Sequence, residues 1–446
     1  MREKNELHII ETKYKFNKLK HKDLYIWPLI RHKLYFEVFK SKTEFDARFR
    51  TRNKFLLLRN FFFGFSTLFR IKRFQYIFFN NADKRLLVKD QKRYDVFFDA
   101  WADKFGQDKS LFIEWAITKH FSKKESYSKN IISDLPFKTG IFLIKALTKS
   151  TKLDVNDLNK IKSALLTKTN INKLVNERLV EIKFYRLLFK LIRPKAVFLI
   201  SGFTKETIVI AAHLQNIKVI EAQHGYIGHN HQFYNSTYYF AQLYYPDILL
   251  TFGDYEKKSL PNNFIYKAEQ LLPIGSLYLE DIYANFNSSE LENLTTNYKK
   301  VFCVTLQNVE EEKLINWVLK QAKQYPNFLF ILKPRRVLTD YNRYTTIKNC
   351  ILLPSFTVYE VLKYSDYNIT IYSTTAIEAK VFDAKTLFYN INNLSVKYYD
   401  INDLYAALIN EGDCMTQDHL KLGETNIKSY FVSNYYNNVK ALKIIS

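Results

Sequence analysis

The sequence contains few cysteines, glycines and prolines. Its 446 residues include three Cys, ten Gly and nine Pro. Cys303, Cys350 and Cys414 lie far apart and form no Cys-x-x-Cys pair. This spacing excludes a disulfide framework and the familiar structural zinc sites, and it favours a reducing compartment.

Long apolar runs are also lacking. The first residues, Met1–Glu6, are charged and lack the apolar core of a signal peptide. No uncharged apolar run of about 18 residues occurs, so no membrane-spanning helix is predicted. We therefore expect a cytoplasmic protein.

Several catalytic motifs are absent from the chain. Without G-x-x-x-x-G-K-[ST] it is not expected to be a P-loop NTPase, and without G-x-G-x-x-G after a strand a nicotinamide cofactor is disfavoured. The lack of Asp-x-Asp removes the usual metal-dependent diphosphate site. The lack of G-x-S-x-G argues against a serine hydrolase.

Basic residues, by contrast, are in large excess, with a formal net charge of +23. Residues 47–82 contain eight Lys or Arg, eleven Phe or Tyr and no acid. Within them, 55–69 suits a helix lying in an anionic membrane interface, which would dock the protein on the inner face of the bacterial inner membrane. A buried helix with a basic rim and a single-stranded nucleic-acid site are the alternatives.

The hydrophobic pattern predicts two α/β domains. After about 50 helical residues, short continuous apolar runs alternate with amphipathic stretches, which indicates parallel βαβ units. Expected strands lie at 74–79, 94–98, 196–201, 217–222, 247–252, 271–275, 301–305, 328–332, 351–353, 368–371 and 386–389. The stretch from about 99 to 191 is expected to be mostly helical. We assign 1–270 to an N-terminal Rossmann-like domain with a helical extension, 271–425 to a C-terminal one, and 426–446 to a helix that packs back on the first.

A histidine-rich loop follows the strand at 217–222. The segment Glu221–Tyr234 contains two glycines and His224, His229 and His231. Glycine lets backbone approach a ligand, and histidine can accept a proton near neutral pH, as attack by a sugar hydroxyl requires. Zinc ligation and a purely structural turn are the competing interpretations, although no nearby acid or cysteine completes a zinc-ligand spacing.

A run of hydroxyl side chains follows the strand at 368–371. Ser373, Thr374 and Thr375 stand where a helix begins, and amide groups there attract phosphate. Glu378, one turn further, can accept hydrogen bonds from ribose hydroxyls. The alternative is a capping box, in which Thr375 and Glu378 only satisfy backbone amides.

Two further strand ends carry candidate ligand groups. Lys333, Arg335 and Arg336 follow the strand at 328–332 and suit a diphosphate or an acidic sugar, unless they merely form a solvated basic end. Gly275 and Ser276 form a shorter loop at the expected domain junction.

These islands together resemble a known family. Gln223-His224-Gly225, Gly253, Gly275-Ser276, Lys333-Pro334 and Ser373–Ala379 occur in this order, and the chain is similar to the GT-B glycosyltransferases of bacterial capsule, lipopolysaccharide and teichoic-acid-type assembly. The segment Tyr25–Arg31 also resembles the start of some members. The resemblance implies a GT-B fold, with two Rossmann-like domains facing a central cleft.

The resemblance also implies roles for these residues. Donor phosphates would meet Ser373, Thr374, Thr375 and Lys333, with Glu378 on the ribose. Gly275, Ser276 and Arg335 would complete the donor site. His224 would be the base or an acceptor-site group, and Gln223, Gly225, His229 and His231 would line the acceptor side of the cleft.

This sequence departs from the family pattern in two places. Many relatives have Lys-Pro-His-Pro where this chain has Lys333–Arg336, so any role of that histidine is lost or passes to Arg335. The paired glutamates eight residues apart of many retaining members are missing, because Thr386 stands eight positions after Glu378. Inversion at the anomeric carbon is therefore favoured.

We accordingly expect an inverting, metal-independent glycosyltransferase without a cofactor. Its donor would be a UDP- or CMP-linked sugar, and its acceptor a surface polysaccharide or a lipid-linked glycan. No nucleic-acid partner is expected. A sugar-nucleotide epimerase of similar fold and a non-enzymatic basic membrane- or nucleic-acid-binding protein are the alternatives.

Overall fold

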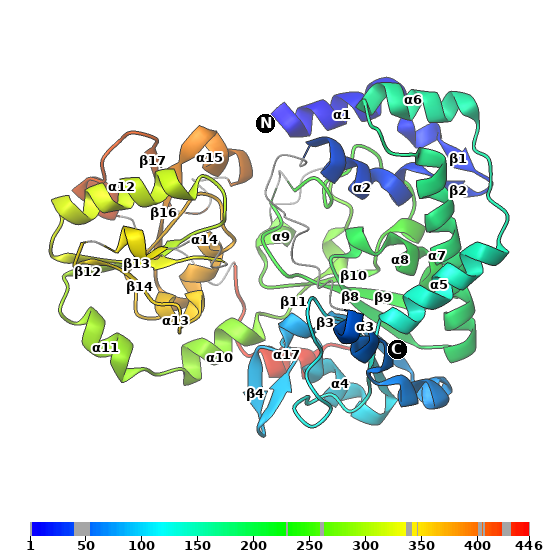
Figure 1. Cartoon of the computed structure of the whole chain (residues 1–446), viewed down its shortest axis with the longest axis horizontal. Coiled ribbons are helices and arrows are strands. Elements are labelled where there is room, and N and C mark those ends of the chain that lie inside the picture. Colours follow the sequence, from blue (N-terminus) through cyan, green and yellow to red (C-terminus); the bar gives the residue numbers. More distant parts are fainter. Residues whose placement is uncertain are drawn as a thin grey trace.

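The chain folds into two α/β domains that lie side by side (Figure 1). A computed structural model describes residues 2–39, 54–228, 231–258, 263–335, 341–345, 347–399, 404, 406–421 and 430–445. His229, Arg336 and residues 47–53 of the basic aromatic segment, all singled out in the sequence, lie outside the described residues.

The first domain is built on a seven-stranded parallel sheet in the order β11-β10-β9-β8-β3-β6-β7. The strands are β3 (Tyr76–Asn81), β6 (Ser110–Trp115), β7 (Ile131–Ser133), β8 (Ala196–Ile200), β9 (Lys218–Ala222), β10 (Ile248–Thr251) and β11 (Leu271–Pro273). Six of these strands, all except β11, are almost entirely buried. Burial on both faces explains their continuous apolar sequences.

The second domain has a six-stranded parallel sheet in the order β14-β13-β12-β15-β16-β17. The strands are β12 (Lys300–Thr305), β13 (Phe328–Lys333), β14 (Cys350–Leu352), β15 (Tyr367–Thr370), β16 (Lys385–Asn390) and β17 (Ala407–Asn410). Counted along the chain within each domain, both sheets place their first strand beside their fourth. This is the doubly wound order of Rossmann folds.

Helices cover both faces of each sheet. In the first domain, α5 (Leu135–Leu147), α7 (Ile171–Ile192) and α8 (Glu206–His213) pack on one face, and α4 (Asp99–Phe105) and α17 (Tyr435–Ala441) on the other. In the second, α12 (Glu311–Gln324) and α16 (Gln417–Leu420) oppose α10 (Leu277–Asn285), α13 (Val358–Leu362) and α14 (Thr375–Glu378). Neighbouring side chains alternate between the two cores, as Phe302 and Cys303 do.

The remaining helices are short or lie outside the two sheets. They are α1 (Arg2–Tyr14), α2 (Trp27–Phe39), α3 (Lys54–Phe62), α6 (Val155–Leu165), α9 (Tyr255–Lys258), α11 (Ser289–Thr295) and α15 (Leu394–Tyr398). The extension α1, α2 and α6 shares a separate apolar cluster with α7. Within it, Arg31 forms an ion pair with buried Glu11 at 2.6 Å. Tyr25–Arg31, the segment that resembles the start of some glycosyltransferases, therefore helps to hold this extension together.

The sequence prediction was wrong for several elements. Strands β6 and β7 lie in the stretch expected to be mostly helical, β17 was not predicted, and a small hairpin of β1 (Lys20–His21) and β2 (Leu24–Tyr25) separates the first two helices. Of residues 94–98, expected as a strand, Tyr94 ends a short strand and 95–98 form the turn that precedes α4. A second hairpin, β4 (Leu87–Lys89) with β5 (Lys92–Tyr94), precedes that turn.

Strand pairing moves the expected domain boundary. β11 begins at Leu271 and pairs with β10, so the first sheet extends past residue 270. The last helix is also shorter than 426–446: the described part of that stretch is helical only over α17. α17 lies against α4, where Lys104 Nζ donates to the carbonyl of Val439 at 2.7 Å.

Two Rossmann-like domains with added N-terminal helices are the GT-B architecture, so the predicted fold class is confirmed.

Candidate active site

The carboxyl ends of the strands face each other where the two domains meet. In doubly wound sheets, ligands bind outside these ends at the point where strand order reverses. The reversal lies between β3 and β8 in the first domain and between β12 and β15 in the second. The loops there carry Lys84, Ser201, Gln307 and Ser373.

A pocket of about 90 Å³ lies between the domains at this place. Its lining comes from both domains and from the segment that joins them. The polar and sequence-predicted residues of the lining are Lys84, Gln223, His224, Gly275, Ser276, Tyr278, Tyr359 and Glu378. Five of the predicted site residues are thus brought together.

His224 lies on the wall of this pocket and remains accessible to solvent. Its Nε2 is 3.2 Å from the hydroxyl of Ser201, which stands directly after β8. Ser201 has a left-handed backbone with φ of 56°, a conformation that is costly for a residue with a side chain and is often retained at functional sites. Desolvation, aided by the positive charges of Lys84 and Lys205, lowers the pKa of His224 to about 4. The imidazole is therefore neutral near pH 7 and can accept a proton.

Gln223 fixes the loop that carries His224. Its amide nitrogen donates to the Glu256 carboxylate at 2.6 Å and to the Gly225 carbonyl at 3.0 Å. Its amide oxygen accepts from the Phe252 backbone at 2.7 Å. The loops after β9 and β10 are thereby locked together, so Gln223 positions the site.

Glu378 lines the pocket and does not form a capping box. The N-cap residue is Thr374 and makes no side-chain cap, while the Glu378 carboxylate accepts a hydrogen bond from Tyr359 at 2.9 Å. Burial raises the pKa of Glu378 to about 7, against smaller opposing effects of the Tyr359 hydrogen bond and the charge of Lys84. A carboxyl group held this way is available to a ligand.

The hydroxyl loop before α14 is largely occupied by its own contacts. The Ser373 amide donates to Thr370, and the Thr375 amide donates to the Ser373 hydroxyl. Thr375 itself is buried and accepts from Asn368. Helix α14 spans a single turn, so its dipole is small. Ser373 and Thr374 are partly accessible, and any phosphate contact from this loop falls mainly to them.

The histidine loop and the hydroxyl loop touch each other across the domain boundary. A Cβ placed on Gly225 would lie 3.6 Å from the Thr374 hydroxyl. The ring of Tyr226 stacks on Tyr399 at 4.7 Å, and the Tyr399 hydroxyl donates to the Ser373 carbonyl at 2.7 Å. The two sequence-predicted loops therefore form one site.

Gly275 and Ser276 lie at the start of α10, in the same pocket. Gly275 has φ of 91°, and an added Cβ would come within 2.3 Å of the Val432 carbonyl. Only glycine fits this junction, where the returning C-terminal segment passes the chain between the domains.

Lys333 does not reach the pocket. Its buried ammonium group donates to the carbonyl of Leu353 at 2.5 Å and also to that of Phe356. The expectation that Lys333 lies beside the donor phosphates therefore does not fit this geometry. Arg335 is exposed. Burial raises the pKa of Tyr359 well above its ordinary value, and the charge of Arg335 opposes that rise.

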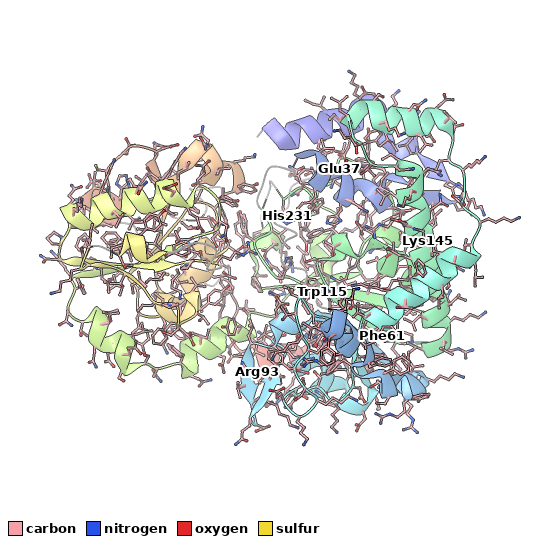
Figure 2. The ribbon with its side chains drawn as sticks, viewed as in Figure 1. Glu37, Phe61, Arg93, Trp115, Lys145 and His231 are labelled. Atoms are coloured by element: carbon pink, nitrogen blue, oxygen red, sulfur yellow. The ribbon has the colours of Figure 1, made fainter. Side chains whose placement is uncertain are left out.

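His231 lies apart from His224. Figure 2 shows it on the first domain, and its ring packs against Tyr234 at 4.7 Å and Phe203 at 5.7 Å. It belongs to an aromatic cluster and not to the interdomain pocket. No group of three or more His, Cys, Asp or Glu suited to a metal ion occurs in the part of the chain that the structure describes.

Sequence reasoning missed Lys84, Ser201 and Tyr359. Lys84 and Ser201 follow β3 and β8, and a search of every strand end would have included both. Tyr359 lies inside α13, and no local pattern marks it as a partner of Glu378.

Comparisons with known proteins yield structural likeness only. No family model matches the chain, and no curated protein matches it. The UDP-GlcNAc 2-epimerase from Neisseria meningitidis bound to UDP-GlcNAc is 12% identical with a TM-score of 0.45, over 82% of this chain and 97% of that one. The UDP-GlcNAc 2-epimerase from Methanocaldococcus jannaschii is 9% identical with a TM-score of 0.45, over 82% and 97%. The calicheamicin glycosyltransferase is 10% identical with a TM-score of 0.45, over 82% and 93%.

These solved structures include both epimerases and transferases, so the likeness does not separate the two activities. Among the described helices, none has the length and apolar character needed to cross a membrane.

Proposed function

We propose that this protein is a glycosyltransferase that moves a sugar from a nucleotide-sugar donor to a bacterial surface polysaccharide or a lipid-linked glycan. The observation that carries the proposal is the interdomain pocket, which has neutral His224 on one domain and buried Glu378 on the other. Both groups stand at the strand ends where doubly wound folds bind ligands.

In this proposal the second domain holds the donor. The hydroxyls of Ser373, Thr374 and Ser276 meet the phosphates, and Glu378 accepts hydrogen bonds from the ribose. Lys84 lines the pocket from the first domain. Arg335 is exposed and follows β13 on the second domain, and in this proposal both residues add positive charge beside the donor. These charges suit a UDP- or CMP-linked sugar and require no metal ion.

His224 acts as the general base. A hydroxyl of the acceptor gives its proton to the imidazole as its oxygen attacks the anomeric carbon, and the nucleotide leaves with the electrons of the broken bond. A single base opposite the leaving group inverts the configuration at that carbon. The bound diphosphate raises the basicity of His224 by its negative charge, which offsets the effect of Lys84.

Calorimetry with UDP, CMP and GDP tests the donor site first. We expect one of them to bind in the pocket, and Glu378→Ala to weaken that binding. No binding of any nucleotide above background would overturn the proposal.

The epimerase alternative is tested with the matching nucleotide sugar. A transferase hydrolyses its donor only slowly when no acceptor is present. Rapid conversion to an epimeric nucleotide sugar under the same conditions would replace transfer by epimerisation.

A further inference from the structure

Two neighbouring helices of the first domain leave apolar side chains uncovered. We call this the α3–α5 surface; it consists of α3, the following 3-10 helix η3 (Phe65–Arg73) and α5. Helices α3 and α5 are in contact, and Figure 2 shows Phe61 of α3 and Lys145 of α5 on the same domain.

The sequence left open whether residues 55–69 are core or surface. In the structure α3 buries only Asn60, and Phe62 is 58% exposed. On α5, Phe142 is 68% and Leu147 88% exposed. Burying such side chains is worth about 1.5–3 kcal/mol each, so their joint exposure indicates a partner.

Helix α5 is apolar on two sides. One side packs into the first domain, where Phe137 is buried and Gly140 lies so close to Phe184 that an added Cβ would be 2.5 Å from the ring. The other side carries Phe142, Leu143 and Leu147, all exposed. The exposed side of α5 therefore takes no part in packing the first domain.

Positive charge surrounds the apolar side chains. Residues 54–82 contain five Lys or Arg and no acid, and α5 adds Lys138 and Lys145. Both α5 lysines are paired with acids, Lys138 with Asp134 at 2.5 Å and Lys145 with Glu177 at 2.8 Å, so the excess of positive charge comes from residues 54–82.

A pocket of about 810 Å³ opens at the edge of this surface, between the end of α3 and the loop after β6. It is lined by the cations Arg59, Lys119 and Lys123 and by aromatic rings that include Phe62 and Phe121. Glu125 is the acid in the lining, and it accepts from the Ser122 amide at 2.8 Å. The lining therefore carries more positive than negative charge.

This pocket lies on the same sheet edge as the candidate active site. Strands β3 and β6 are parallel neighbours, so the loop with Lys84 and the loop with Lys119 leave the sheet on the same side. Between them, buried Glu114 joins Arg85 at 2.7 Å to His120 at 2.8 Å. The two loops are thereby held in a fixed relation.

We propose that the α3–α5 surface binds an anionic lipid bilayer, with its exposed apolar side chains in the interface and a phosphate-bearing lipid headgroup in the 810 Å³ pocket. Charge complementarity selects an anionic bilayer over other apolar partners. The proposal of bilayer binding depends only on the α3–α5 surface. A role of that binding in presenting a lipid-linked acceptor rests on the proposed transferase activity.

Vesicle cosedimentation of the full chain tests this proposal. Vesicles of phosphatidylcholine alone are compared with vesicles that also contain phosphatidylglycerol. Each basic residue near an anionic surface contributes about fivefold in affinity, so we expect at least about tenfold tighter binding to the anionic vesicles.

Two double variants separate charge from insertion. Arg59→Glu with Lys123→Glu should lower affinity for anionic vesicles at least about tenfold, and Phe142→Ser with Leu147→Ser should lower it about as much. Lys320→Glu with Lys323→Glu on α12 makes the same change in net charge on the second domain and should have little effect. Circular dichroism verifies that each variant is folded.

Equal binding to both vesicle types would overturn the proposal, as would unchanged binding of the Phe142 and Leu147 variant. An equal loss of vesicle affinity in the α12 control variant would show that net charge alone is responsible. That result would overturn the proposed headgroup site in the pocket. Calorimetry with UDP on the wild-type protein reports on the donor site separately, so either claim can fail without the other.

Discussion

At the scale of single residues, His224 is the candidate general base, because it lines the pocket and its pKa is lowered to about 4 by burial. Replacing it with Ala should lower kcat by at least about 100-fold, the usual contribution of a general base, and should leave the fold intact. Ser201→Ala should have a smaller effect, because it removes only the hydroxyl beside the imidazole. The measurement is steady-state transfer with matched thermal melting curves.

His231→Phe is the matched control for this prediction. Its ring sits in the aromatic cluster outside the pocket, so activity should stay close to that of the wild type. If His224→Ala keeps near-normal turnover, or if His231→Phe is equally inactive, the base has been assigned to the wrong histidine.

Glu378 gives a prediction for stability against pH. Its pKa is raised from 4.5 to about 7 by burial, so the folded protein holds a proton that the unfolded chain has released between these values. Stability from this group is full below about pH 4.5 and is lost as the pH rises through 7. The Glu378→Gln side chain cannot ionise, so the variant does not lose stability in this way. Its free energy of unfolding relative to the wild type should therefore be higher at pH 8 than at pH 4.5, by up to about 3 kcal/mol.

Urea unfolding at both pH values measures this difference, and calorimetry on the same variant measures nucleotide affinity. Higher stability at pH 8 together with weaker nucleotide binding is expected for a carboxyl group that a ligand must satisfy. A pH-independent difference in stability would contradict the buried, protonated state.

At the scale of elements, Lys333 joins the end of β13 to the loop after β14. Removing its ammonium group leaves the carbonyls of Leu353 and Phe356 without this donor. Lys333→Met should therefore lower the free energy of unfolding by about 1–3 kcal/mol while leaving nucleotide affinity unchanged. A selective loss of nucleotide binding, with stability preserved, would return Lys333 to the phosphate site where the sequence had placed it.

The elements that the sequence predicted well are the long, continuous apolar strands. β8, β9, β12 and β13 are each buried on both faces, so their sequences are nearly continuous apolar runs that can be recognised directly. β7 is only three residues long, and β6 reads as apolar residues in a Lys-rich setting that a helix would equally accept. Short strands are defined by their partners, and the partner is not visible in local sequence.

The candidate site follows the same division. Strand-end residues such as His224, Ser276 and Glu378 were found because loops after parallel strands converge on one edge. The contact of Tyr359 with Glu378 depends on how α13 packs beside α14. The hydrogen bonds of Lys333 to two backbone carbonyls likewise depend on tertiary packing. Neither contact can be predicted from residue spacing in the sequence.

At the scale of the whole molecule, the interdomain pocket is too small for the ligand that we propose. Its volume of about 90 Å³ is well below the range of roughly 300–1,000 Å³ that small-molecule sites usually have. The contacts that close it, Gly225 beside Thr374 and Tyr226 on Tyr399, join loops of different domains. We therefore expect the domains to separate when the donor enters.

A reversible crosslink tests this motion. A Cβ at residue 225 would lie 3.6 Å from the Thr374 hydroxyl, so Gly225→Cys with Thr374→Cys places two thiols within disulfide reach. Cys414, which is exposed, is replaced by Ser, whereas Cys303 and Cys350 are buried and can remain. Nucleotide binding is then measured by calorimetry in the oxidised and the reduced protein.

The oxidised variant should bind nucleotide at least about tenfold more weakly than the same variant after reduction, because the closed pocket cannot admit the donor. Comparing the two redox states of one protein cancels any direct effect of losing the Thr374 hydroxyl. Each single cysteine variant should show no redox dependence. If the oxidised double variant binds as tightly as the reduced one, the donor enters without separation of the domains, and the pocket must enlarge by local movement of its loops.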